Sequence, residues 1–258
     1  MNEPITCDKL VDLVPTWAPF PGWTVLLDPG PRHHAPDPVS GLSRLALDPS
    51  VWTEEPLLAA LRSVAEHLAA SPPGLGITAL LPPDTYHVTL CDGFSVRSPS
   101  RAAEPAATRL QEMIDALPGA VVDTDALTLG SGVALTALLD AAAGSITFAF
   151  DALEVRGTAL VAALETIDAA VPAIVDARAT VLTEMSAVAG QDLVVPWRPH
   201  ISLAYLANES REDAWASVLQ TASAELATPP PPAIGYRGAA TYAFADMITF
   251  RRAERTTA

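Results

Sequence analysis

Two stretches of this sequence share one short pattern: Tyr86-His87-Val88-Thr89-Leu90-Cys91 in the first half and Trp197-Arg198-Pro199-His200-Ile201-Ser202-Leu203-Ala204-Tyr205 in the second. Each contains, in succession, a histidine, an apolar residue, a hydroxyl residue and a second apolar residue. Both stretches are rich in β-prone residues, and side chains i and i+2 of a strand point to the same face. Each therefore predicts a strand with an imidazole and a hydroxyl on one face and two aliphatic side chains on the other.

Two such strands that face one pocket would bring two histidines and two hydroxyls together. Histidine has an ordinary pKa of about 6.5, so it can accept or donate a proton near neutral pH. Hydroxyl groups can donate hydrogen bonds to oxygens on which negative charge develops. We therefore predict that His87 and His200 are a catalytic acid-base pair and that Thr89 and Ser202 bind phosphate. The sequence leaves open which histidine is the acid and which is the base.

On these motifs the chain resembles the 2H phosphoesterases, the superfamily of 2′-5′ RNA ligase-like proteins and cyclic phosphodiesterases. Residues 81–94 and the early stretch 19–25 are most similar to a bacterial branch of unknown function, and residues 198–203 are similar to the second motif of the whole family. The resemblance extends over about residues 17–252 and implies two lobes around a central cleft, with one motif from each. The two histidines are farther apart than in compact members, and we place the excess in residues 101–145, a candidate insert.

Four more residues are candidates for the same pocket. Arg198 lies two residues before His200 and shares its strand face, unless it is an ordinary surface arginine. Cys91 shares the face of the first histidine, either as a nucleophile or as a small buried hydrophobe. Thr24 can approach the phosphate if its strand lies beside the motif strands. Trp197 can stack on a base or pack in the core.

Other residues of catalytic type have simpler interpretations. Tyr86 and Tyr205 lie at odd offsets from the motif histidines, so we expect them to point away from the pocket unless a bulge turns one inward. His33-His34 is half of a metal site at most, and in a Pro/Gly-rich loop we expect solvated side chains instead. His67 belongs to a predicted helix and is expected at its surface.

The composition of the chain restricts the kinds of ligand that the protein is expected to bind. The formal net charge is −15, so the average surface repels a long polyanion, and we expect a small phosphorylated, nucleotide-like substrate rather than long nucleic acid. No Walker loop, dinucleotide fingerprint, HExxH motif or paired CxxC is present, so we predict no cofactor and no metal site. The sequence does not indicate an oligomeric state.

The sequence also predicts the cellular compartment of the protein. No run of about 18 uncharged apolar residues is present, so we expect no membrane span. The N-terminus lacks the pattern of a signal peptide, and two cysteines make no disulfide framework. We therefore expect a cytoplasmic protein.

The predicted order mixes strands and helices without a regular βαβ period, which predicts an α+β fold with antiparallel sheets. The resemblance implies that the fold has two lobes, with these sheets lining a central cleft and helices outside. We expect residues 1–258 to form a single two-lobed domain in which residues 1–20 are an N-terminal arm. The expected strands are 23–28, 43–47, 77–81, 86–91, 126–129, 133–138, 145–153, 196–206 and 239–252. The expected helices are 54–70, 101–117, 157–188 and 210–226. Thr53 is expected to cap the first of these helices, and Pro172 to interrupt the third. Residues 229–232, four prolines after position 228, are expected to be a rigid linker.

Together these features predict a metal-independent phosphodiesterase that hydrolyses a small nucleotide-like phosphodiester or a 2′,3′-cyclic phosphate. One alternative keeps the site but assigns it to a tailoring enzyme acting on a phosphorylated intermediate of specialised metabolism. A second alternative is a sensor that binds a nucleotide or phosphometabolite without turnover. Two intact motifs favour the enzyme, because a binding protein does not need two titrating histidines.

Overall fold

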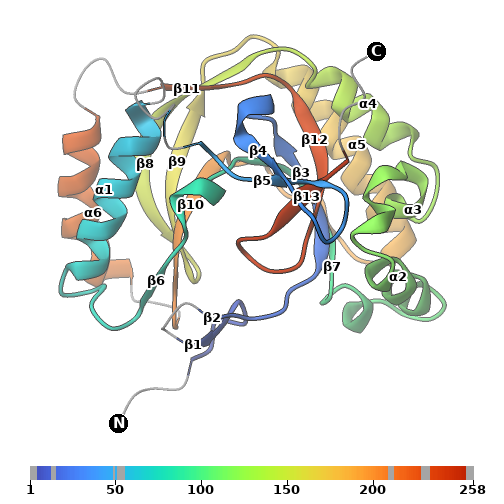
Figure 1. Cartoon of the computed structure of the whole chain (residues 1–258), viewed down its shortest axis with the longest axis horizontal. Helices are drawn as coiled ribbons and strands as arrows, with labels where there is room; N and C mark the ends of the chain where they lie inside the picture. The colour runs from blue at the N-terminus through green and yellow to red at the C-terminus, as the bar shows by residue number, and fades with distance from the viewer. Residues whose placement is uncertain are drawn as a thin grey trace.

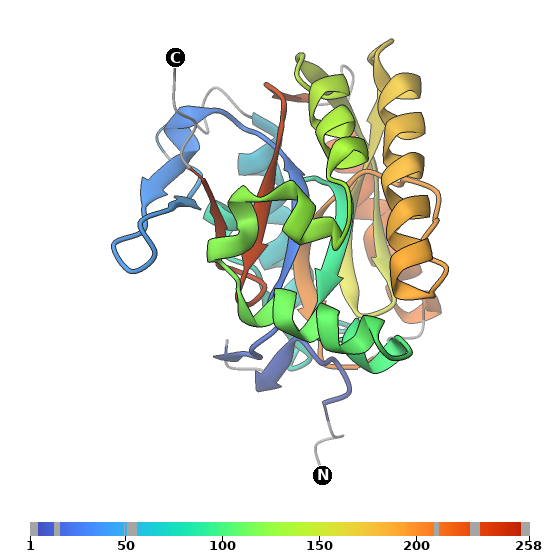
Figure 2. The same cartoon turned by 90° about the vertical axis from the view of Figure 1, so that its right-hand side faces the viewer.

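Two antiparallel β-sheets face each other at the centre of the molecule, and helices cover their outer sides (Figure 1 and Figure 2). This arrangement comes from a computed structural model that describes residues 5–12, 16–48, 50, 56–208, 212–227 and 233–253. Every strand pairing among these residues is antiparallel. The predicted α+β fold with antiparallel sheets and outer helices is therefore confirmed.

The first sheet has six strands and contains the first motif. Its order is β4-β5-β13-β12-β3-β7, so strands from both ends of the chain lie side by side. The strands are β3 (Gly22–Leu27), β4 (His34–Pro36), β5 (Ser43–Leu45), β7 (Thr89–Ser95), β12 (Ala239–Phe244) and β13 (Phe250–Arg252). Strand β3 is buried along its whole length because it lies between β12 and β7 in the sheet.

The second sheet has five strands, in the order β11-β8-β9-β10-β6, and contains the second motif. The strands are β6 (Thr78–Leu80), β8 (Ile146–Arg156), β9 (Ala159–Thr166), β10 (His200–Leu206) and β11 (Ala233–Tyr236). A separate hairpin of β1 (Leu10–Asp12) and β2 (Thr16–Trp17) lies in the N-terminal arm.

Two groups of helices cover the outer faces. Helices α1 (Pro56–Ala70) and α6 (Glu212–Leu226) pack on the five-stranded sheet. On the other side, α2 (Ala106–Asp115), α3 (Thr124–Thr128), α4 (Val133–Ala141) and α5 (Val171–Ala189) form a group that reaches β7. Short 3-10 turns are η1 (Pro31–His33), η3 (Pro83–Thr85), η4 (Pro99–Arg101) and η5 (Gly119–Val122). None of the helices in the described ranges is long and apolar enough to cross a membrane.

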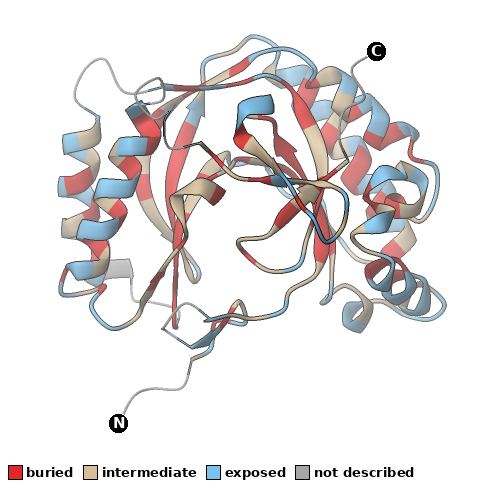
Figure 3. Ribbon diagram, in the orientation of Figure 1, coloured by how far each residue is buried: buried red, intermediate tan, exposed pale blue. Residues whose placement is uncertain are grey.

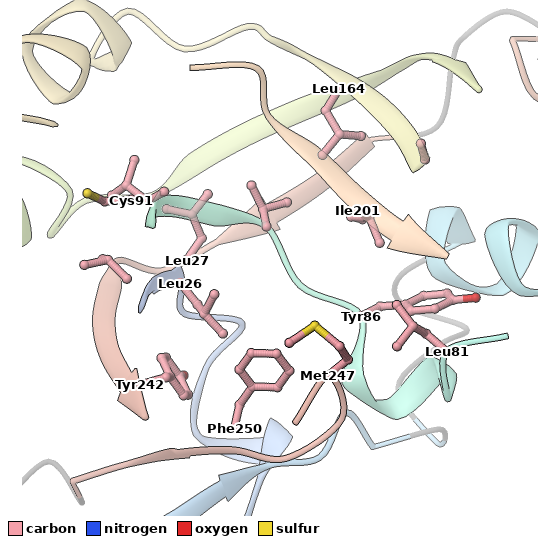
Figure 4. Packing of buried hydrophobic residues seen from close by; sticks show 14 of the residues in the cluster. Leu26, Leu27, Leu81, Tyr86, Cys91, Leu164, Ile201, Tyr242, Met247 and Phe250 are labelled. Atoms are coloured by element: carbon pink, nitrogen blue, oxygen red, sulfur yellow. The ribbon is translucent and has the colours of Figure 1, made fainter. Parts of the chain in front are cut away.

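The core lies between the sheets and under the helices, and Figure 3 shows buried residues along the strands and the inner faces of the helices. The largest fully buried side chains are Trp23, Trp215, Tyr242, Phe94 and Phe148. Figure 4 shows Cys91, Ile201 and Phe250 among the packed hydrophobic residues of this cluster.

Two expectations about the middle of the chain were wrong. The strands expected at 126–129 and 133–138 are the helices α3 and α4. The carboxylate of Asp123 caps α3 by accepting from the backbone N–H groups of Asp125 and Ala126, and this cap favours the helix. With α2, these helices make residues 101–145 largely helical.

The helix expected over 157–188 is a strand followed by a helix. Residues 159–166 form β9, which lies between β8 and β10, and a strand buried on both sides has a continuous apolar run without alternation. Pro172 lies in the first turn of α5, where no backbone N–H is needed, so it begins this helix instead of interrupting it. The expected cap at Thr53 and the linker 229–232 lie outside the described residues.

Candidate functional site

The two motif strands meet where the two sheets come together. Val88 and Ile201 form an isolated antiparallel bridge, just before β7 and within β10. In an antiparallel pair, this register sets His87 opposite Ser202 and sets Thr89 opposite His200. Val88 and Ile201 are fully buried, whereas the histidines and hydroxyl residues are partly exposed. The alternation predicted for each motif is therefore present.

These four residues line one cavity of about 360 Å³ between the sheets. Three of the four further candidates, Thr24, Trp197 and Arg198, also line it, and Cys91 does not. The remaining described lining residues are Lys9, Phe20, Leu81, Leu90, Asp92, Arg156, Arg178, Val195, Pro196, Tyr205, Phe244, Met247 and Phe250. A larger cavity of about 620 Å³ lies between α1 and the turn 82–86, shares only Leu81, and contains none of the predicted site residues.

The two imidazoles are held by the same local hydrogen bond. Nδ1 of His87 lies 2.7 Å from the carbonyl oxygen of Thr85, and Nδ1 of His200 lies 2.8 Å from the carbonyl oxygen of Arg198. A carbonyl oxygen only accepts, so each Nδ1 carries the hydrogen and each neutral ring keeps a free lone pair on Nε2. Nη1 of Arg156 donates to the same Arg198 carbonyl and lies 3.2 Å from Nδ1 of His200.

The surroundings of both histidines favour the neutral form. Burial lowers the pKa of His87 to about 4, and the nearby His200 and Lys9 act in the same direction. Burial also lowers the pKa of His200, with the cations Arg156 and Lys9 adding to the effect. Each ring can therefore accept a proton on Nε2, and a bound anion would raise both pKa values by stabilising the imidazolium form.

The rings differ in what surrounds them. The ring of His87 packs on Phe250, with centroids 4.5 Å apart and planes at 60°. His200 instead lies beside the guanidinium of Arg156, which also pairs with Glu154 at 2.7 Å. One histidine is therefore in apolar contact, and the other has a charged neighbour.

The hydroxyls of Thr89 and Ser202 make no hydrogen bond within the described residues, although both line the cavity. They are therefore available to a ligand. The hydroxyl of Thr24 differs, because it donates to the carbonyl of Cys91 at 3.0 Å. Thr24 lines the cavity with its hydrogen bond already made.

A β-bulge follows the hydroxyl residue in both motif strands. In β7, Thr89 pairs with Leu26 and Cys91 with Val25, so Leu90 is extra; in β10, Ser202 pairs with Val161 and Ala204 with Leu160, so Leu203 is extra. An extra residue reverses the side-chain alternation beyond it. The residue three positions after each hydroxyl therefore faces the cavity, and these two residues are Asp92 and Tyr205.

The bulges explain two placements that simple alternation missed. Cys91 is fully buried away from the cavity, and burial raises the pKa of its thiol to about 12, which does not suit a nucleophile. Tyr205 was expected to point away, and it lines the cavity instead. Tyr86, which no bulge separates from His87, is buried and does not line this cavity, as expected.

Trp197 and Arg198 precede β10 in the segment that forms one wall. The indole Nε1 of Trp197 donates to the carbonyl of Thr89 at 2.9 Å, and its ring meets Phe148 edge to face. This bond ties the second motif to the first. The side chain of Arg198 is exposed at the cavity.

Sequence reasoning missed the other cations of this cavity. Arg178 is only 5% exposed, and it donates to the carbonyls of Leu90 at 2.8 Å and Val195 at 2.7 Å. A signal for it existed, because Arg178 interrupts the apolar stripe of a helix. Lys9 could have been noticed as the only lysine of the chain. The described lining thus holds four cations, Lys9, Arg156, Arg178 and Arg198, against the single carboxylate of Asp92.

His33 and His34 both make hydrogen bonds within the fold. Nδ1 of His33 accepts from the backbone of Asp48, and His34 bonds Gly30 and the hydroxyl of Tyr242. Within the described ranges, no three His, Cys, Asp or Glu side chains gather in a way that could hold a metal. The expectation of solvated side chains was wrong for His33, which is buried. His67 is exposed on α1, as expected.

The fold has counterparts among solved structures. ATU0111 from Agrobacterium tumefaciens, a protein of unknown function, is 16% identical over 98% of this chain and 93% of that chain, with a TM-score of 0.58. This likeness shows a shared fold. A phosphoesterase (14% identity, 90% and 95% coverage, TM-score 0.39) and E. coli LigT complexed with 3′-AMP (13%, 92% and 96%, 0.41) are matched too weakly to add to the argument. No family model and no curated protein matches the sequence.

Proposed function

We propose that this chain is a metal-independent phosphodiesterase of the 2H type, acting on a small nucleotide-like phosphodiester or 2′,3′-cyclic phosphate. His87 and His200 are its acid-base pair. The observation that carries the proposal is the bridge between Val88 and Ile201, because it aligns two identical chemical motifs across one cavity. A single histidine on a strand has many structural explanations, and two in this register have far fewer.

The reaction follows from the groups at the cavity. Nε2 of one neutral histidine removes a proton from water, and the water oxygen bonds to phosphorus. The bond from phosphorus to the leaving alkoxide breaks, and the other histidine, as imidazolium, protonates that oxygen. The hydroxyls of Thr89 and Ser202 donate hydrogen bonds to the non-bridging oxygens as their charge increases. In this step one histidine gains a proton and the other loses one, and exchange with solvent restores both before the next turnover.

The lining supports a small anionic ligand with a flat or apolar part. The protein carries a net charge of −15, yet cations outnumber carboxylates at this cavity. A small phosphorylated ligand fits the cavity volume, and the average surface opposes a long polyanion. Aromatic side chains can stack on a base. Those that line the cavity are Phe20, Trp197, Tyr205, Phe244 and Phe250.

The first experiment is hydrolysis in EDTA of 2′,3′-cyclic mononucleotides and of 2′-5′ and 3′-5′ dinucleotides. We expect the wild-type protein to hydrolyse at least one substrate, and His87→Ala and His200→Ala each to lower kcat by roughly 10²–10⁴-fold. His67→Ala, at an exposed helix position, is the matched control and keeps the wild-type rate. Near-normal turnover by either motif variant contradicts the acid-base pair.

Lack of turnover on the whole panel would point to the other two functions. A thermal-shift screen against nucleotides and phosphometabolites then separates them. Binding without any hydrolysis favours a sensor. Turnover of a bound phosphometabolite that is not a nucleotide favours a tailoring enzyme that uses the same four motif residues.

A further inference from the structure

The N-terminal arm joins both sheets beside the cavity. The backbone N–H groups of Thr6 and Cys7 donate to the carbonyl of Ala207, just after β10, each at 2.9 Å. At the other end of the arm, the N–H of Phe20 donates to the carbonyl of Ala245, just after β12, at 2.8 Å. The arm is therefore joined to one sheet through residues 6–7 and to the other through residue 20.

Lys9 lies between these two anchors, and its side chain lines the cavity. Its Nζ donates to the hydroxyl of Tyr205 at 3.0 Å and lies 4.4 Å from the centroid of that ring and 5.9 Å from that of Phe20. An ammonium group has three N–H donors, so two remain for a ligand. Among the described residues, no carboxylate pairs with Lys9.

The charge of Lys9 affects the histidines of both motifs. It lowers the pKa of His87 and also that of His200. The other charged groups that act on His200 are Arg156, in the same direction, and Asp92, in the opposite one. Of the cations that line the cavity, Lys9 is thus the one whose charge acts on both imidazoles.

We propose that Lys9 binds a non-bridging phosphoryl oxygen of the substrate, so that the N-terminal arm supplies a third part of the site beside the two histidine motifs. A partly desolvated ammonium with free donors and no carboxylate suits a phosphate oxygen. The bulge that turns Tyr205 inward makes this possible, because the Tyr205 hydroxyl and ring hold the lysine at the cavity. This assignment rests on the proposed function.

The test compares Lys9→Met, Lys9→Arg and Arg97→Met as full-length proteins. Methionine keeps an apolar chain beside the rings and removes the charge together with the N–H donors, including the one that bonds the Tyr205 hydroxyl. Arg97 is the matched control, since its guanidinium also lies over Phe20, at 5.3 Å, and pairs with Asp8 of the arm, but does not line the cavity. Inorganic phosphate is the probe, and histidine ring signals in NMR report both its binding and the histidine pKa values.

We expect Lys9→Met to weaken phosphate binding about 10- to 100-fold, the effect of losing a charged hydrogen bond. Lys9→Arg recovers most of the loss, and Arg97→Met binds as the wild type does. In the phosphate-free protein, Lys9→Met raises the pKa of both motif histidines, because the charge of Lys9 lowers both. This change reports that the ammonium lies near both rings, and the phosphate affinity reports whether it binds the ligand.

The outcomes separate this inference from the proposed function. If the wild type hydrolyses a phosphodiester and Lys9→Met keeps the wild-type phosphate affinity, the inference is wrong and the function stands, whatever the histidine pKa values do. Equal weakening by Lys9→Met and Arg97→Met also overturns it, because the arm then acts only by packing. If phosphate binds through Lys9 but no phosphodiester is hydrolysed, the function is wrong and the inference stands. Absence of phosphate binding in the wild type overturns the inference, and the hydrolysis assay then decides the function by itself.

Discussion

At the scale of single residues, His87 and His200 share one orienting hydrogen bond and differ in the side chains that lie against the ring. Each Nδ1 donates to the carbonyl two residues earlier, so the tautomer is set by local backbone geometry. Phe250 packs on the first ring, and Arg156 lies beside the second. Equivalent motifs can therefore take unequal roles in one reaction, as acid and base must.

The pH dependence of kcat/KM tests the protonation states. The proposed reaction needs one neutral and one protonated histidine. A plot of kcat/KM against pH is therefore bell-shaped, and its two sides report the two histidine pKa values of the free protein. Burial lowers the pKa of His87 to about 4 and also lowers that of His200, so we expect the maximum below pH 6.5. Rates measured from about pH 4 to about pH 9, with NMR titration of both rings, check this. A maximum above pH 7 would contradict it.

The motif hydroxyls give a second prediction at this scale. Thr89→Val and Ser202→Ala remove one donor each from the non-bridging oxygens, and we expect kcat to fall roughly 10²–10³-fold with little change in stability. The control is Thr241→Val, whose hydroxyl donates to the carbonyl of Val121 at 3.2 Å away from the cavity. It should lose stability and keep its kcat. Steady-state kinetics and thermal unfolding of the three variants decide between these roles.

At the scale of elements, the two motif strands are built alike. A histidine is followed two residues later by a hydroxyl, and then by a bulge that turns the residue three positions beyond the hydroxyl toward the cavity. The histidines differ in place, because His200 begins β10 whereas His87 lies two residues before β7, although a strand was expected over 86–91. Bulges are common next to active sites because they redirect side chains without ending a sheet. This shared construction places Asp92 and Tyr205 at equivalent points of the two strands.

A second bulge in β7 depends on a glycine. Gly22 pairs with Ser95 and Thr24 with Asp92, so β7 has an extra residue there, and a Cβ on Gly93 would lie 2.3 Å from the Trp23 ring. We expect Gly93→Ala to lower the free energy of unfolding by about 1–3 kcal/mol, as overpacking does. Urea unfolding provides the measurement.

The matched control for this prediction is a glycine in another strand. A Cβ on Gly235, in β11, would have no atom within 4 Å, so Gly235→Ala should be neutral or slightly stabilising. Equal losses in the two variants would mean that contact with Trp23 does not explain the glycine at position 93.

At the scale of the whole molecule, charge is distributed unevenly. The chain has a net charge of −15, yet the cavity shared by the two sheets collects lysine and arginine from the N-terminal arm, β8, α5 and the segment before β10. A low-dielectric cleft concentrates the field of such a cluster. An acidic protein can thereby attract a small anion to one place and repel long polyanions elsewhere.

Buried histidines also predict how the whole fold responds to acid. Burial and the charge of Arg252 lower the pKa of His34 to about 4, and burial does the same for His87. The unfolded chain then binds protons first as the pH falls, so stability is full above about pH 6.5 and declines toward about pH 4. Urea unfolding at about pH 7 and about pH 5 should show the loss, and His34→Gln should reduce the difference. An equal difference in that variant would contradict this account.

The local pattern of the site could be predicted from the sequence alone. Histidine and hydroxyl alternate with buried aliphatics at a period of two, and this period is a property of a strand whatever it packs against. The antiparallel α+β class also followed from local signals. Where the local signal was ambiguous, as in the apolar run of β9 and the Ala/Leu-rich segments of α3 and α4, the predicted element was wrong.

Which other residues join the motifs at the cavity depends on tertiary packing. The bulges that bury Cys91 and expose Tyr205 to the cavity depend on the register with β3 and β9, and register is set by partners far away in the chain. Lys9 reaches the cavity through backbone hydrogen bonds of the arm to distant segments, and the Arg178 side chain is held there by its own donation to the carbonyls of Leu90 and Val195. Local periodicity contains no information about such contacts, because they form only when the two sheets pack against each other.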